Sequence, residues 1–153
     1  MTDRFFDPFQ LEALRDLVFA LVAGALLGAE REAARKPAGL RTHMLVAAGA
    51  ALFVAVGEAL LRGLDPASAT VRSDPIRVLE ALVTGVSFLG AGTILRRRGR
   101  DHVEGLTTAA SLLVTAAIGA AIALDQFLLA AGATAITFVV LRLLIRPSLT
   151  AGS

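Results

Sequence analysis

Long apolar runs alternate with short charged blocks along most of the chain. We predict from them five membrane-spanning helices, at residues 14–29, 42–61, 78–95, 106–124 and 127–145. Each run holds about 16–20 residues, at the short end of the range for a helix that crosses ~30 Å of hydrocarbon. Hydrocarbon offers no partner to an open strand edge, so helices are the expected spanning element.

The prolines support these boundaries. Proline interrupts the hydrogen bonds of a helix interior, and all five prolines fall outside the predicted spans, at Pro8, Pro37, Pro66, Pro75 and Pro147. The pattern therefore predicts an all-α, polytopic transmembrane bundle. We expect a single domain over residues 1–153, with no soluble C-terminal domain and no removable signal peptide.

Composition narrows the possible functions. Hydrophobic residues make up 56% of the chain and the mean hydropathy is +0.71, above the 45–50% apolar share of a soluble domain. The absence of cysteine excludes disulfides, thiolate metal sites and a cysteine nucleophile. No catalytic triad order, zinc-protease motif or nucleotide-binding loop is present. We therefore expect no enzymatic activity and no cofactor, although Mg²⁺ binding stays possible.

Loop charge predicts the orientation. Ten basic residues flank the ends that we place in the cytoplasm: Arg31, Arg35, Lys36, Arg41, Arg96, Arg97, Arg98, Arg100, Arg142 and Arg146. Five lie on the other side: Arg4, Arg15, Arg62, Arg72 and Arg77. By the positive-inside rule, the N-terminus is outside and the C-terminus is cytoplasmic. Basic residues with this role need no nucleic-acid partner.

A charged turn between the first two spans holds the first candidate site. Glu30 and Arg41 lie at its membrane edges, and we predict that they form an ion pair, because pairing lowers the cost of holding charge near lipid. Glu30 could instead offer oxygen ligands to a divalent cation, and a purely structural turn is the alternative. Gly39 allows a positive φ. His43 is interpreted as a hydrogen-bonded packing residue, since Mg²⁺ prefers oxygen.

Small residues within the spans have two interpretations. Gly24 and Gly28 form a GxxxG motif in the first span, which favours packing inside the monomer over a dimer seam. Gly85, Gly90 and Gly92 weaken the third span. A broken helix there could line a site, but close packing against a neighbouring helix is the favoured interpretation.

Polar residues recur along the fourth span. Glu104, Thr108, Ser111 and Thr115 are spaced four, three and four residues apart, so they share one helical face, and Thr107 is the predicted cap of the helix. Such a stripe could line a polar pathway. The favoured interpretation is that the hydroxyls bond to backbone carbonyls of their own helix.

Three stretches, in this order, resemble the membrane domain of the MgtC/SapB family. The matching residues are Glu30–Arg31, Lys36–His43, Asp74–Pro75 with Arg77, Gly85 with Phe88–Ile94, and Gly105–Ser111. The resemblance implies a bacterial inner-membrane protein of Mg²⁺ homeostasis and low-Mg²⁺ adaptation. It also implies a relation to virulence and a possible partner such as the F-type ATP synthase, besides the lipid bilayer and a possible homo-oligomer.

Two hypotheses follow for the function. In the first, a cytoplasmic-facing cluster serves Mg²⁺ homeostasis by binding a partner or an ion, with Glu30 as the candidate metal ligand. In the second, the chain is a transporter or channel for Mg²⁺ or another ion. The predicted cluster consists of Glu30, Arg31, Lys36, Pro37, Gly39, Arg41, Thr42, His43, Gly90, Gly92, Thr107, Thr108 and Ser111. We expect Glu30 to lie near Arg41, the backbone of residues 90–92 and Thr107 or Thr108.

Overall fold

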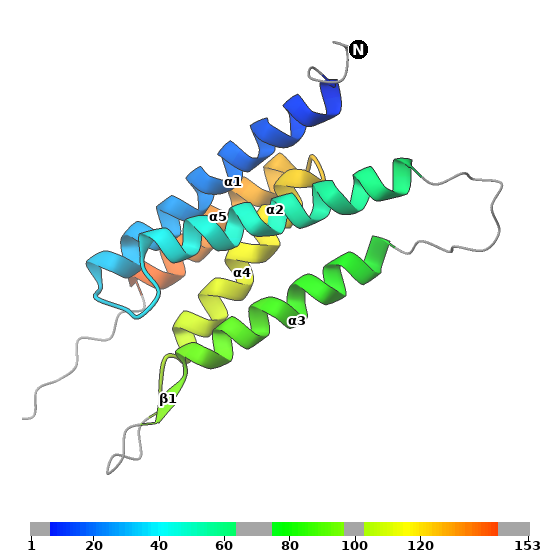
Figure 1. Cartoon of the computed structure of the whole chain (residues 1–153). Helices are drawn as coiled ribbons and strands as arrows, with labels where there is room; N and C mark the ends of the chain where they lie inside the picture. The colour runs from blue at the N-terminus through cyan, green and yellow to red at the C-terminus, as the bar shows by residue number, and fades with distance from the viewer. Residues whose placement is uncertain (1–6, 64–74, 97–102, 144–153) are drawn as a thin grey trace, which may run out of the picture.

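The computed structural model describes residues 7–63, 75–96 and 103–143. These residues form five helices and one short strand pair (Figure 1). The helices are α1 (Pro8–Ala33), α2 (Leu40–Arg62), α3 (Pro75–Thr93), α4 (Leu106–Ala123) and α5 (Phe127–Leu143). The strands β1 (Leu95–Arg96) and β2 (Val103–Glu104) pair antiparallel between α3 and α4.

The predicted helical bundle is confirmed, with small differences at the helix ends. Helix α1 begins at Pro8, because the side chain of Asp7 accepts the Phe9 amide hydrogen (3.1 Å) and caps the helix. Helix α3 ends at Thr93, so Leu95 belongs to β1 and not to the third span as predicted. Residues 144 and 145, the predicted end of the fifth span, lie outside the described residues.

The start of α4 corrects one prediction. Its N-cap is Gly105 and not Thr107, and no side chain completes the cap. Gly105 has a φ of +96°, in the left-handed region, and a Cβ there would collide with the Thr93 carbonyl. Glycine alone fits this close turn, which explains why the strand pair can deliver the chain directly into α4.

Three helices are long and apolar enough to cross a membrane: α2, residues 76–93 of α3, and α4. Helix α5 is apolar but shorter, at 17 residues. Helix α1 has 26 residues, but the charges of Arg15–Asp16 and Glu30–Glu32 leave only residues 17–29 uncharged. The chain is a membrane protein built from helices of unequal length.

Close contacts of backbone with backbone hold α1, α2 and α4 together. A Cβ added to Gly24 of α1 would lie 2.5 Å from the carbonyl oxygen of His43 in α2, and one added to Gly28 would lie 2.7 Å from the Leu40 Cα. Gly119 of α4 approaches the backbone of Ala47 in the same way. The interpretation of the GxxxG motif as internal packing is confirmed.

Helix α3 stands apart from this tight group. It lies beside α4 near its C-terminal end and runs alongside α2 with less contact (Figure 1). Only 11% of residues 76–93 is buried, against 56% of the corresponding stretch of α4. The bundle therefore has a packed part, formed by α1, α2, α4 and α5, and a more exposed helix on one side.

The glycine contacts predict a difference between two conservative substitutions. Gly24→Ala places a methyl group against the His43 carbonyl and should destabilise the protein by about 1–3 kcal/mol, as overpacking does. Gly132→Ala on α5, where an added Cβ meets no atom within 4 Å, should be neutral or stabilising. Thermal loss of the helical circular dichroism signal in detergent measures both, and equal midpoints would contradict the close contact.

Candidate functional site

Most of the matched stretches gather at one end of the bundle, which we call the basic end, whereas Pro75 and Arg77 at the start of α3 lie at the opposite end. Here α1, α3 and α5 end, and α2 and α4 begin (Figure 1). Alternating helix direction brings these termini together although they are far apart in the sequence. Asp74 of the matched stretches lies outside the described residues.

A buried ion pair lies at the centre of this end. Arg31 Nε lies 2.5 Å from Glu30 Oε2, and each side chain is only 3% exposed. Arg31 Nη2 also donates to the carbonyl oxygen of Leu141 at 3.1 Å, so the guanidinium joins the end of α1 to the end of α5. A buried charge needs such partners, because it has given up its hydration.

The predicted ion pair between Glu30 and Arg41 is wrong. Glu30 is paired with its own neighbour Arg31, whereas Arg41 is exposed and lines a groove between α2 and α3. The Leu141 carbonyl of α5 explains why Glu30 pairs with Arg31 and not with Arg41. It accepts a hydrogen bond from the Arg31 guanidinium, which holds that group inside the bundle beside Glu30.

The turn between α1 and α2 is held by backbone contacts. Glu32 Oε2 accepts the Leu40 amide hydrogen at 2.9 Å, and the Gly39 carbonyl accepts the His43 amide hydrogen at 3.2 Å. Gly39 has a φ of −102°, so the turn does not need the positive φ that glycine allows. The left-handed residue of this turn is Arg35, with a φ of 53°. Lys36, Pro37 and Thr42 are exposed.

His43 connects this turn to α4. Its side chain is fully buried, with Nδ1 3.1 Å from the Gly39 carbonyl oxygen and Nε2 3.1 Å from Ser111 Oγ. A carbonyl oxygen can only accept, so Nδ1 carries a hydrogen. The interpretation of His43 as a hydrogen-bonded packing residue is confirmed.

The polar stripe of α4 is largely satisfied within its own helix. Thr108, Ser111 and Thr115 are buried, while Glu104 is exposed on β2. Ser111 Oγ lies 2.8 Å from the Thr108 carbonyl oxygen, and Thr115 Oγ1 donates to the Ser111 carbonyl oxygen at 2.7 Å. The favoured interpretation, hydroxyls bonded to backbone carbonyls, is confirmed.

The glycines of α3 do not join the Glu30 cluster as predicted. Gly90 is buried against Ala109 of α4, where an added Cβ would lie 3.3 Å from the alanine Cβ, and this contact confirms close packing for Gly90. A Cβ added to Gly92 would meet no atom of another element within 4 Å, and Thr107 is exposed. The predicted single cluster is therefore divided by α4, whose buried hydroxyls and Ala109 lie on different faces.

The sequence predictions missed two sets of contacts between helices. The Leu141 carbonyl has no sequence signature. At the opposite end, Arg15 is paired with the buried Asp16 (2.8 Å) and with Asp125 in the turn before α5 (3.0 Å). Arg15 and Asp16 are adjacent charges of opposite sign at the edge of an apolar run, and this pattern is the sequence signal that could have indicated these ion pairs.

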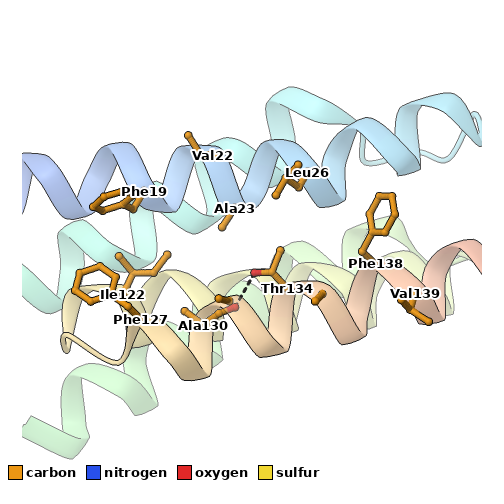
Figure 2. Close-up of a pocket in the computed structure, with 12 residues that line it drawn as sticks. Phe19, Val22, Ala23, Leu26, Ile122, Phe127, Ala130, Thr134, Phe138 and Val139 are labelled. Atoms are coloured by element: carbon orange, nitrogen blue, oxygen red, sulfur yellow. Dashed lines mark hydrogen bonds between the residues drawn. The ribbon is translucent and has the colours of Figure 1, made fainter.

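Apolar grooves flank the packed part of the bundle. One, of about 580 Å³, lies between α1 and α5 with Ile122 of α4 at its base. Figure 2 shows Phe19, Val22 and Leu26 of α1 on one side of it and Phe138 and Val139 of α5 on the other. Its one polar side chain, Thr134, donates to the Ala130 carbonyl oxygen at 2.8 Å.

Comparison with known proteins identifies the relatives of this chain. The profile of the MgtC family matches residues 17–148. The chain belongs to the MgtC family. The resemblance stated above is thereby confirmed, and it covers the packed helices, the buried ion pair and the polar stripe together.

Curated relatives come from several bacteria. "Putative magnesium transporter YhiD" of Escherichia coli K12 is 43% identical over 128 residues, 82% of this chain and 57% of that protein. "Protein MgtC" of Salmonella typhimurium LT2 is 43% identical over 122 residues, 79% of this chain and 47% of that protein. "Protein SrpB" of Synechococcus elongatus is 42% identical over 117 residues, which are 69% of this chain and 60% of that protein. The chain spans about half the length of these relatives. No solved structure matches it significantly.

The buried ion pair predicts a difference between single and double substitutions. Arg31→Met leaves Glu30 buried without a partner and should cost about 3–5 kcal/mol, whereas Glu30→Met with Arg31→Met should restore most of that loss. Thermal unfolding followed by circular dichroism compares the two.

Glu58→Gln is the matched control, because Glu58 pairs with Arg62 on the exposed surface, where ion pairs contribute little. If Arg31→Met were as stable as this control, Glu30 and Arg31 would not form a buried pair in the membrane protein.

Proposed function

We propose that this chain is a non-enzymatic protein of the bacterial inner membrane that serves Mg²⁺ homeostasis through its basic end, by contact with a partner and not by transport. Family membership and a relative named "Putative magnesium transporter YhiD" support the link to Mg²⁺. The ten-to-five distribution of basic residues supports a cytoplasmic basic end, with the N-terminus outside.

One observation carries this proposal: the deepest polar groups at the basic end satisfy one another. Glu30 is engaged by Arg31, and the Leu141 and Gly39 carbonyls accept from Arg31 and His43. Within the described ranges, every fully buried side-chain nitrogen and oxygen has a hydrogen-bond partner. Such an arrangement resembles a rigid support more than a site that exchanges ligands.

The donor set around Glu30 does not fit Mg²⁺. This ion takes a near-ideal octahedron of oxygens and keeps several waters. Glu30 offers one carboxylate that is 3% exposed and already neutralised by a guanidinium, so a second cation beside Arg31 would meet repulsion. We therefore assign Glu30 to the support of the basic end and not to metal coordination.

A partner would bind the exposed surface of the basic end. The exposed residues there include the acidic Glu32 and, from the predicted cluster and its turn, Arg35, Lys36, Pro37, Arg41 and Thr42, whose three basic side chains leave the turn with a net positive charge. Their positive charge suits an acidic patch on another membrane protein, and the F-type ATP synthase is the candidate that the family resemblance implied. The buried cluster holds the turn that presents these residues.

Transport of Mg²⁺ or another ion is the second candidate, favoured by the name of the Escherichia coli relative and by the hydroxyls of α4. Those hydroxyls bond to carbonyls of their own helix, which speaks against a continuous polar path. Mg²⁺ flux into liposomes that contain the purified protein separates the two functions. Robust saturable flux, absent from empty liposomes, would refute the non-transport proposal.

A complementation experiment tests the basic end. In a host that needs an MgtC-type protein to grow at low Mg²⁺, we expect Glu30→Gln to abolish rescue and Glu58→Gln to retain it, because Glu58 lies at the other end of α2. Membrane protein levels are compared by blot. If the Glu30→Gln strain grew as well as wild type at equal membrane protein levels, Glu30 would not be required for the function of the basic end.

Reporter fusions test the orientation. A cytoplasmic reporter fused after Ser153 should be active, while alkaline phosphatase at the same point should be inactive, because the charge distribution favours a cytoplasmic C-terminus. Alkaline phosphatase fused before Met1, behind an export signal, gives the reciprocal measurement. Phosphatase activity at the C-terminus would reverse the proposed topology.

A further inference from the structure

A large apolar groove runs between α2 and α3, on the more exposed side of the bundle. Its volume is about 830 Å³, within the usual range for ligand sites. The two helices touch near the end opposite the basic end, where Gly57 accommodates Val78. Ala50 of α2 and Val86 of α3 share a buried apolar cluster with α4, and both residues also line the groove.

The interior of this groove is recessed and its rim is bulky. Gly49 of α2 and Gly85 of α3 both line it, and a Cβ added to either meets nothing within 4 Å. Its rim includes Leu45, Phe53 and Leu89, which are 70%, 64% and 52% exposed. The groove thus has open space at the two glycines, between large apolar side chains.

This shape suits an acyl chain better than a helix. Close helix association in lipid needs small residues at the contact, but here the exposed side chains of Leu45, Phe53 and Leu89 stand one helical turn from Gly49 and Gly85. A hydrocarbon chain is thin and flexible enough to fill the space.

Charge at the basic end of the groove indicates the head group. Arg41 and Thr42 line the groove there, and Arg41 forms no ion pair among the residues that the structure describes. The adjoining turn adds the exposed Arg35 and Lys36. Glu32, whose carboxylate accepts the Leu40 amide hydrogen, is acidic, but Arg35, Lys36 and Arg41 outnumber it, so the local charge is positive.

The other end is less suited to an anion. Arg77 lines the groove there, but Glu80 follows three residues later and lies on the same face of α3. We propose that the α2–α3 groove holds an anionic phospholipid of the leaflet at the basic end, with its phosphate at Arg41 and its acyl chains along Gly49 and Gly85. Basic pockets between transmembrane helices bind such head groups in general.

Native mass spectrometry of the detergent-purified protein tests this site. Phosphatidylglycerol and phosphatidylcholine with identical acyl chains are titrated separately. Wild type should prefer phosphatidylglycerol by about fivefold, the effect of one basic residue near an anionic lipid. Arg41→Gln should remove that preference. Gly85→Leu should weaken binding of both lipids by about tenfold or more, as expected when about two methylene groups are displaced.

Matched controls separate the groove from the rest of the surface. Gly132→Leu fills open space on α5, and Arg142→Gln removes an exposed arginine from the last turn of α5; both should bind lipid as wild type does. Circular dichroism verifies that each variant is folded. Equal affinity of wild type for the two lipids, or unchanged binding in Gly85→Leu, would overturn the proposal.

A cross-linking experiment tests whether a second copy covers the groove instead. The chain has no cysteine, so Phe53→Cys introduces a single thiol at the rim. In vesicles we expect the protein to remain monomeric after oxidation. Efficient disulfide formation between two copies would show that a protein surface occupies the groove, and the lipid proposal would fail.

Discussion

Hydrocarbon gives a polar group nothing to bond with, and the arrangement of this bundle follows from that constraint. Glu30 and Arg31 pair with each other, and Arg31 also bonds to the last turn of α5. Ser111 and Thr115 lie within hydrogen-bonding distance of carbonyls of their own helix. Because these groups are satisfied inside the protein, the helices that carry them are tied to particular neighbours and particular heights in the bundle.

The same constraint explains the use of small residues. With no hydrophobic driving force between helices in lipid, association depends on close contact. Gly24 and Gly119 bring two helices onto the backbone of α2, which makes α2 the central element of the packed part. Helix α3 contributes one comparable glycine contact with α4, at Gly90, and correspondingly remains the most exposed of the three long apolar helices.

Much of the fold could be predicted from the sequence, because span length and proline placement are local properties. The shared face of Thr108, Ser111 and Thr115 was also predictable from helical periodicity. The partner of Glu30 was not, because it depends on the carbonyl of Leu141, 110 residues further along the chain than Arg31. Periodicity states which residues share a face, but not which neighbour that face meets, so the separation of Gly90 from Glu30 by α4 also escaped prediction.

The bond between Arg31 and Leu141 has a consequence for biogenesis. Chains are made from the N-terminus, at about 5–20 residues per second, so α1 enters the membrane well before α5 has been synthesised. During that interval the guanidinium of Arg31 lacks the carbonyl that receives it in the finished protein. Helix α1 is thus inserted with an incomplete charged end, and α5 completes it once it has been synthesised.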